Sequence, residues 1–279
     1  MNARAIPATQ PARIRLENRR TVLDEPRRCV GLHFFNPAAQ LPLVEVIRCE
    51  DTDQAALDVA FAFVKAIGKF PLECKSAPGF VVNRLLGPYM AEAMYLAEAG
   101  IPLAAIDAAA ERFGMPMGPI ELIDSVGLDV AMHVSTVLSE AFDRPVPNTL
   151  PGLVEAGRLG RKSGHGFYQW EAGTAVKPDI NGTETPSNMT DRLILPLVNE
   201  AVACLSEGIV RDADLLDAGV IFGTGFAPFR GGPLQYARDR GIDDVTNALE
   251  QLAREFSDQG GNRFRPHDGW ATLGAATGS

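Results

Sequence analysis

Residues 83–101 read NRLLGPYMAEAMYLAEAGI, and residues 191–209 read DRLILPLVNEAVACLSEGI. The two stretches align without a gap and share seven of nineteen residues, namely Arg84/Arg192, Leu85/Leu193, Pro88/Pro196, Glu92/Glu200, Ala93/Ala201, Gly100/Gly208 and Ile101/Ile209. Farther along, Gly118-Pro119 has a counterpart in Gly232-Pro233. This repetition predicts two copies of one helical unit. Each copy needs a partner for its apolar stripe, and packing the copies on each other is the simplest solution.

Most of the chain after Pro78 has the periodicity of amphipathic helices. This pattern predicts helices over residues 80–99, 103–113 and 128–142, and a further helix near Glu121. Strand-like runs are rare in this part. Residues 171–186 are rich in Pro, Gly, Thr and Asn, a composition that is typical of a linker between the two copies.

The chain before Pro78 follows a different pattern. Short apolar runs at residues 29–35, 43–47 and 70–74 predict strands, and residues 55–67 predict a helix between the last two. The fold class predicted is therefore an α-rich α/β protein. It divides into an α/β piece over residues 1–77, a first helical domain over 78–170, a linker over 171–186 and a second helical domain over 187–279.

Composition narrows the class of function. The 279 residues are 46% hydrophobic and 22% charged, which is ordinary for a soluble globular protein. The net charge is -9 and the pI near 5.0, so nucleic acid and anionic membrane are disfavoured as partners. The four cysteines form no CxxC pair and no zinc pattern, so we expect no metal, reduced thiols and a cytoplasmic location. No stretch approaches the ~20 apolar residues of a membrane span.

Two polar residues lie in runs that are otherwise apolar. His33 is near the end of one predicted strand, and Glu45 is in the middle of the next. A buried glutamate without a partner is costly. Adjacent strands that place Glu45 beside His33 would fix the imidazole tautomer and leave its other nitrogen as a proton acceptor. From the residues alone, a structural histidine and an acid at a strand rim remain the commoner explanation.

Several separated motifs resemble, in order, those of the 3-hydroxyacyl-CoA dehydrogenases. They are GLHFFNP at 31–37, LVEV at 43–46, PGFVVNR at 78–84, MPMGP at 115–119 and KSGHGFY at 162–168. The duplicated helical unit, with FAPFRGG at 226–232, resembles the C-terminal part of the multifunctional fatty-acid oxidation α-subunits, which fuse an enoyl-CoA hydratase to this dehydrogenase. The resemblance covers about residues 28–268.

The resemblance implies a half of a Rossmann domain followed by two repeated helical domains. It implies NAD-dependent oxidation of 3-hydroxyacyl-CoA in fatty-acid β-oxidation. His33 would be the general base and Glu45 would orient it, while Asn83 would contact the substrate and Asn36 and Lys162 would contact NAD. Without the resemblance, Asn36 and Asn83 are explained as turn or capping residues, and Lys162 as a surface lysine.

The sequence also departs from the family. No G-x-G-x-x-G follows a strand-like run, and the nearest approach, Gly223-Thr224-Gly225, lies in the second helical copy. The family's substrate-binding serine falls at Ala12, and Phe222 stands where the α-subunits often have tyrosine. These departures describe an N-terminally truncated member without a hydratase. The alternative is a catalytically silent or partner-dependent fragment that keeps the helical packing surface. A complementing chain or a thiolase subunit would be its partner, and the isolated chain would show weak or no turnover.

The duplication also carries an expectation about assembly. Single-repeat relatives pair their helical domains between subunits, whereas a duplicated unit satisfies that surface within one chain. We therefore expect little need for a homodimer through the helical region. A half of a Rossmann sheet, however, leaves an unpaired strand edge, which favours association.

Overall fold

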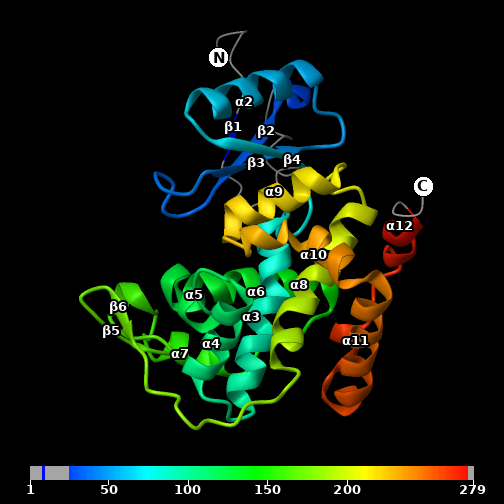
Figure 1. Cartoon of the computed structure of the whole chain (residues 1–279). Helices are drawn as coiled ribbons and strands as arrows, with labels where there is room; N and C mark the ends of the chain where they lie inside the picture. The colour runs from blue at the N-terminus through cyan, green and yellow to red at the C-terminus, as the bar shows by residue number, and fades with distance from the viewer. Residues whose placement is uncertain (1–7, 10–24, 276–279) are drawn as a thin grey trace.

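The computed structural model describes residues 8–9 and 25–275, and it has two parts. A small α/β piece lies at one end, and a larger helical part lies below it (Figure 1). The α/β piece holds a four-stranded sheet, β1 (Ala8–Thr9), β2 (Val30–Phe34), β3 (Leu43–Arg48) and β4 (Phe70–Lys75), in that order across the sheet. The β2–β3 pair is antiparallel, and β1 and β4 run parallel to their neighbours.

The helix α2 (Gln54–Ala66) connects β3 to β4 and covers one face of the sheet. This strand–helix–strand unit confirms the sequence prediction for residues 43–74. Side chains alternate along a strand, so Val30, Leu32, Val44 and Val46 point to α2, where they form a small separate core. Leu43 and Ile47 of β3 belong to the main core on the opposite face.

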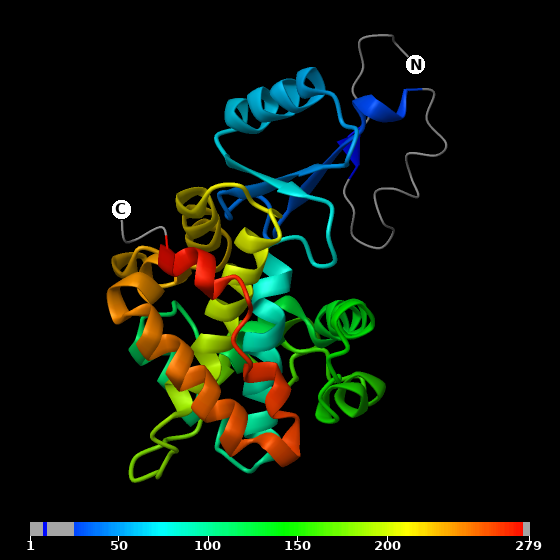
Figure 2. The same cartoon turned by 90° about the vertical axis from the view of Figure 1, so that its right-hand side faces the viewer.

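That opposite face is covered by the second helical copy. Helix α9 (Ala213–Thr224) contacts β3 and β4 and lies across the sheet from α2 (Figure 2). A Cβ atom at Gly219 would overlap with Leu72, and one at Gly223 would overlap with Leu43 and Val82. The two glycines lie four residues apart on one helix face, and their missing side chains let α9 approach the sheet closely.

The helical part contains two successive sets of helices and several 3-10 turns. The first set is α3 (Val82–Glu98), α4 (Leu103–Phe113), α5 (Pro119–Val126), α6 (Leu128–Phe142) and α7 (Thr149–Glu155), and the second is α8 (Met189–Ser206), α9, α10 (Pro233–Arg240), α11 (Ile242–Glu255) and α12 (Trp270–Ala275). The 3-10 turns of this part are η2 (Arg161–Ser163), η3 (Pro228–Arg230), η4 (Ser257–Gln259) and η5 (Gly261–Phe264), whereas η1 (Pro26–Arg28) precedes β2 in the α/β piece.

The central helices α3 and α8 pack on each other and exchange equivalent ion pairs. Arg84 Nε of α3 donates to Glu200 Oε1 of α8 at 2.6 Å, and Arg192 Nε of α8 donates to Glu92 Oε1 of α3 at 2.7 Å. All four residues are buried. Arg84 is the repeat counterpart of Arg192, and Glu92 that of Glu200. The two copies therefore pack on each other, as the sequence repeat predicts, and the exchanged pairs relate them by an approximate two-fold arrangement.

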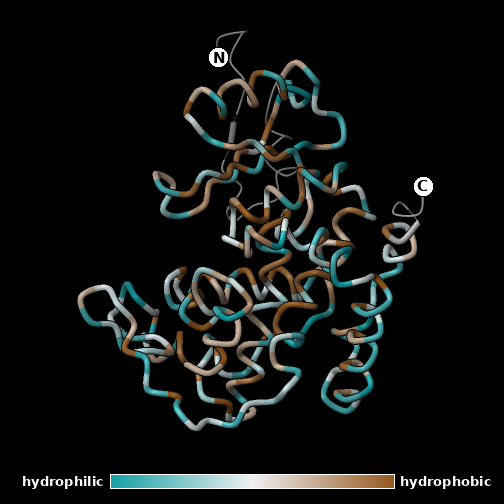
Figure 3. Tube along the Cα trace, viewed as in Figure 1, coloured by the Kyte–Doolittle hydropathy of each residue, from teal (hydrophilic) through white to brown (hydrophobic). Residues whose placement is uncertain are grey.

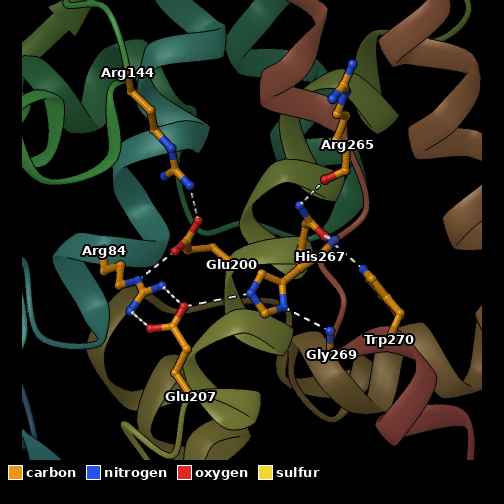
Figure 4. A network of polar contacts seen from close by, with 9 residues as sticks. Arg84, Arg144, Glu200, Glu207, Arg265, His267, Gly269 and Trp270 are labelled. Atoms are coloured by element: carbon orange, nitrogen blue, oxygen red, sulfur yellow. Dashed lines mark hydrogen bonds and ion pairs between the residues drawn. The ribbon is translucent and has the colours of Figure 1, made fainter.

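A polar network extends the Arg84 side of this contact (Figure 4). Arg144 adds a second guanidinium to Glu200, and Arg84 binds both carboxylate oxygens of Glu207 at 2.7 Å. His267 Nε2 lies 3.8 Å from Glu207, and the backbone N–H of Gly269 donates to His267 Nδ1. The network thereby joins the first copy, the second copy and the C-terminal segment of the described chain.

The expected linker begins with a structured hairpin. Strands β5 (Gln169–Glu171) and β6 (Thr174–Val176) pair through a turn in which Ala172 and Gly173 both have positive φ, at 49° and 82°. Positive φ at both central positions is typical of a type I′ hairpin turn. Residues 177–188 then contain no helix or strand.

In the described ranges, no single helix is long and apolar enough to cross a membrane. Helices α5 and α6 reach that length and composition only together, and the chain bends by 103° between them.

Candidate active site

His33 and Glu45 face each other across the β2–β3 hairpin. They are direct partners in the antiparallel register. His33 Nδ1 lies 2.6 Å from Glu45 Oε2, so the predicted contact is confirmed. The Glu45 side chain is completely buried, whereas 13% of the His33 side chain is exposed. Strand alternation places both residues on the sheet face that meets the helical part.

The second oxygen of Glu45 reaches the start of α3. Glu45 Oε1 accepts hydrogen bonds from the backbone N–H groups of Val81 and Val82, at 3.0 and 2.9 Å. A helix N-terminus favours a carboxylate because its first N–H groups lack partners within the helix. These two bonds and the imidazole contact offset the cost of burying Glu45. They also join the sheet to the first helical copy.

A tight turn delivers those two amides. Gly79 and Phe80 both have positive φ, at 74° and 51°. Phe80 is not a glycine, so this conformation costs on the order of 1–3 kcal/mol. The Phe80 ring lies 5.5 Å from the His33 ring, and the Phe35 ring lies 4.6 Å from it. Two aromatic rings therefore flank the imidazole while its Nδ1 edge faces Glu45.

The geometry assigns the proton on the imidazole. A carboxylate only accepts hydrogen bonds, so the Nδ1 atom of His33 carries the hydrogen that Glu45 accepts. In the neutral ring, Nε2 then has a free lone pair. Within the described part of the chain, Nε2 makes no hydrogen bond. The arrangement can remove a proton from a group that approaches Nε2 and can stabilise the resulting imidazolium.

The other predicted site residues are Asn83, Asn36 and Lys162, and they lie on three different elements or loops. Asn83 follows Val82 in the first turn of α3, is partly buried and makes no side-chain hydrogen bond to a described residue. Asn36 is exposed just beyond β2. Lys162 is exposed in η2 and bonds Asp129 of α6 at 2.5 Å. The first turn of α3, which holds Asn83, is thus joined to Glu45 through the Val81 and Val82 amides, and the side-chain contact of Lys162 lies within the first helical copy.

The described residues do not form a phosphate cradle for NAD. Gly223 lies near the end of α9 and packs on Leu43, and the neighbouring Phe222 ring lies 5.0 Å from Phe70. Helix α2 begins after Asp53, and a carboxylate at that point repels a pyrophosphate. Ala12 lies outside the described residues. The chemistry that the described site offers is proton transfer at His33, without a site for the phosphates.

Sequence reasoning missed the backbone donors of the site. The amides of Val81 and Val82 carry no side-chain signature, although the Pro78-Gly79 break before a helix marks their position. The aromatic contacts of Phe35 and Phe80 were within the quoted motifs, but their positions around His33 depend on the turn geometry.

Comparisons with known proteins agree with this architecture. A family model for the 3-hydroxyacyl-CoA dehydrogenase C-terminal domain matches residues 79–170 and again residues 189–277. The model for the 3-hydroxyacyl-CoA dehydrogenase NAD binding domain matches residues 1–77. The double match confirms that the helical unit is repeated.

Individual relatives extend the likeness over most of this chain. A fatty acid oxidation complex subunit alpha from Idiomarina loihiensis is 39% identical over 254 residues, which cover 86% of this chain and 35% of that protein. The dehydrogenase part of multifunctional enzyme 1 from C. elegans has a TM-score of 0.68 at 26% identity, over 98% of this chain and 65% of that one. A 3-hydroxybutyryl-CoA dehydrogenase from Escherichia coli has a TM-score of 0.80 at 24% identity, over 96% of this chain and 75% of that one, and shows the same fold.

The chain therefore spans about a third of the length of the curated relatives that it matches. Within that span, the fold, the repeated helical unit and the motifs around His33 all agree with one family. Family models cover almost every residue from 1 to 277. The chain belongs to the 3-hydroxyacyl-CoA dehydrogenase family.

Proposed function

We propose that the chain supplies the proton-transfer site of an NAD-dependent 3-hydroxyacyl-CoA dehydrogenase of fatty-acid β-oxidation. The observation that carries the proposal is the 2.6 Å contact of His33 with a buried Glu45 whose other oxygen accepts two backbone hydrogen bonds. A structural histidine needs no such arrangement. Family membership supports the choice of a 3-hydroxyacyl-CoA as the substrate and of NAD as the cofactor.

In the proposed reaction, Nε2 of His33 takes the proton from the 3-hydroxyl group. The charge that develops on the imidazole is stabilised by Glu45, which stays in place because the amides of Val81 and Val82 hold its other oxygen. NAD, when bound, supplies the hydride acceptor. Asn83 contacts the substrate, and Asn36 and Lys162 contact the cofactor, in line with their positions in the family motifs.

A second candidate function rests on the Asp53 carboxylate at the start of α2 and on the missing glycine-rich motif. In this alternative, the chain is catalytically silent by itself or depends on another chain for the phosphate cradle. The partner would be a complementing subunit or a thiolase subunit, because relatives are named as subunits of a fatty acid oxidation complex. The division at residues 77, 170 and 186 and a cytoplasmic location are parts of both proposals.

The test combines a tautomer measurement with turnover. Nitrogen NMR of the His33 ring should show a hydrogen on Nδ1 in the native protein, and Glu45→Gln should change that signal. NAD binding is titrated separately. Turnover of 3-hydroxyacyl-CoA with NAD should fall about 10²–10⁴-fold in His33→Ala. His133→Ala serves as the control because His133 is exposed on α6.

Each outcome decides between the candidates. Native turnover that His33→Ala removes supports the enzyme. An Nδ1 hydrogen without NAD binding or turnover supports the partner-dependent fragment, and adding the partner should restore turnover. Equal turnover in the native protein and in His33→Ala would exclude His33 as the base.

A further inference from the structure

The outer face of α2 is apolar along its whole length. Val59, Phe63 and Ile67 are 55%, 49% and 43% exposed, and they follow one another at four-residue intervals. Ala55, Ala62 and Ala66 are also exposed and lie on the same side of the helix. We call these six residues the outer stripe of α2.

The outer stripe is separate from the residues that hold α2 on the sheet. Ala56, Leu57, Ala60 and Val64 are buried against the strands and satisfy the packing of the α/β piece. The solvent-facing side of a surface helix is normally polar. Helix α11 does so, and it is mostly hydrophilic in Figure 3. A contiguous exposed apolar face marks an interaction site.

The charges on α2 indicate which partner fits. Asp58 and Lys65 are the two charged residues of the helix, and both are exposed. The stripe runs from residue 55 to residue 67, so its midpoint is residue 61. Asp58 lies three positions before this midpoint and Lys65 four positions after it. The helix therefore has opposite charges at almost equal distances from its centre.

We propose that the outer stripe of α2 is a docking surface for a second copy of this chain, with the two α2 helices antiparallel. A two-fold axis at residue 61 places Asp58 of each copy beside Lys65 of the other, so both ion pairs form at once. The same axis places Phe63 over Val59 of the partner. The alanines of the stripe leave room for the two helices to approach.

This dimer differs from one formed through the helical region, where the two copies of the repeat already cover each other within one chain. A single pair of helices buries less area than a standard interface, and each chain has a net charge of -9. The dimer is therefore weak and depends on protein concentration and on salt.

The test exchanges the charges. Asp58→Lys gives each dimer site two positive charges, and Lys65→Asp gives each site two negative charges. Each variant alone should dimerise at least about tenfold more weakly in sedimentation velocity. An equimolar mixture of the two variants should recover dimerisation, and so should the chain that carries both substitutions, because opposite charges then face each other again.

Phe63→Lys should abolish the dimer, whereas Val130→Lys, at a helix position that is 43% exposed on α6, should leave it intact. Circular dichroism checks that each variant is folded. A native chain that stays monomeric at all concentrations, with or without Phe63→Lys, would overturn the proposal and leave the stripe to a different partner. A dimer that the charge exchange leaves unchanged would overturn it as well.

Discussion

Asp107 in the first helical copy and Asp217 in the second stand at equivalent places but have different surroundings. Asp107 accepts backbone hydrogen bonds from Ile120 and Glu121 at the start of α5. Asp217 accepts the same two bonds from residues 234 and 235 at the start of α10. A Cβ atom at Gly118 or Gly232 would overlap with the respective aspartate. This shared contact joins α4 to the start of α5 in the first copy and α9 to the start of α10 in the second.

The first copy adds contacts that the second lacks. Tyr168 donates to Asp107 at 2.9 Å, and Lys177 lies 3.2 Å from it. Asp124 accepts bonds from the amides of residues 167 and 168 and from the Trp170 indole, which hold the hairpin segment. At the start of α3, backbone N–H groups donate to the Glu45 side chain. At the start of α8, the Met189 N–H donates instead to the backbone oxygen of Pro186 in the preceding loop. The duplicated contacts hold the frame of each copy. Of the unique contacts, those of Asp107 and Asp124 hold the hairpin segment, and those at the start of α3 hold Glu45.

The largest expected effect comes from breaking the reciprocal ion pairs. Arg84→Met and Arg192→Met each remove one of two arginine partners from a buried glutamate, since Arg144 stays on Glu200 and Arg263 on Glu92. Each should cost about 1.5–3 kcal/mol of unfolding free energy. Arg84→Met should cost more, because Arg84 also binds Glu207. Urea unfolding of both variants measures the difference. A loss below ~1 kcal/mol in either variant would contradict the two-fold arrangement.

A smaller effect concerns pH and the second copy. Burial raises the pKa of Asp217 from its ordinary value of 3.8 to about 6. The native state then holds the proton more tightly than the unfolded state, so stability falls as the pH rises from about 4 to about 6 and levels off above. Asp217→Asn has no carboxyl group at this position and therefore lacks this pH dependence. The stability of the native chain minus that of Asp217→Asn should therefore decline across this window.

The first copy provides the control for that measurement. Burial also raises the pKa of Asp107, and the charge of Lys177 opposes the rise. Lys177→Met should therefore make stability fall more steeply with rising pH at the first copy. A pH profile that is identical in all three chains would show that neither aspartate titrates as its surroundings indicate.

The smallest expected effect on stability comes from Lys162→Ala. The Lys162–Asp129 pair is about half exposed on both sides, so its loss should change the unfolding free energy by less than ~1 kcal/mol. NAD affinity measured on the same variant should fall if Lys162 contacts the cofactor. Arg161→Ala, on the neighbouring exposed residue, is the matched control. Equal loss of NAD affinity in both variants would show that Lys162 acts only as a general surface charge and makes no specific contact with NAD.

Much of the fold could be predicted from the sequence because it depends on the local periodicity of apolar residues. The strands at residues 30–34, 43–48 and 70–75 and the helices at 103–113 and 128–142 lie where the apolar pattern places them. For the His33–Glu45 contact, two adjacent short strands offered only one possibility among others, and the family motifs favoured it. The antiparallel register then sets the two residues directly opposite each other.

What the sequence did not show depends on backbone geometry and on distant segments. The two-residue strand β1 is too short for a periodic signal. The hairpin β5–β6 turns at Ala172, a residue type that rarely adopts a positive φ. The amides that hold Glu45 belong to residues whose side chains are merely apolar. The covering of the sheet by α9 joins residues more than a hundred positions apart, and no local pattern encodes that choice.

The position of α9 has a consequence for synthesis on the ribosome. The sheet of the α/β piece is complete once β4 has emerged, but the helix that covers its second face begins 138 residues after Lys75. At ~5–20 residues per second, that interval lasts roughly 7 to 30 seconds. During this time Leu43 and Leu72 lack the helix that covers them in the finished fold. A nascent chain stalled within this interval should be a substrate for holdase chaperones, which release it when α9 arrives.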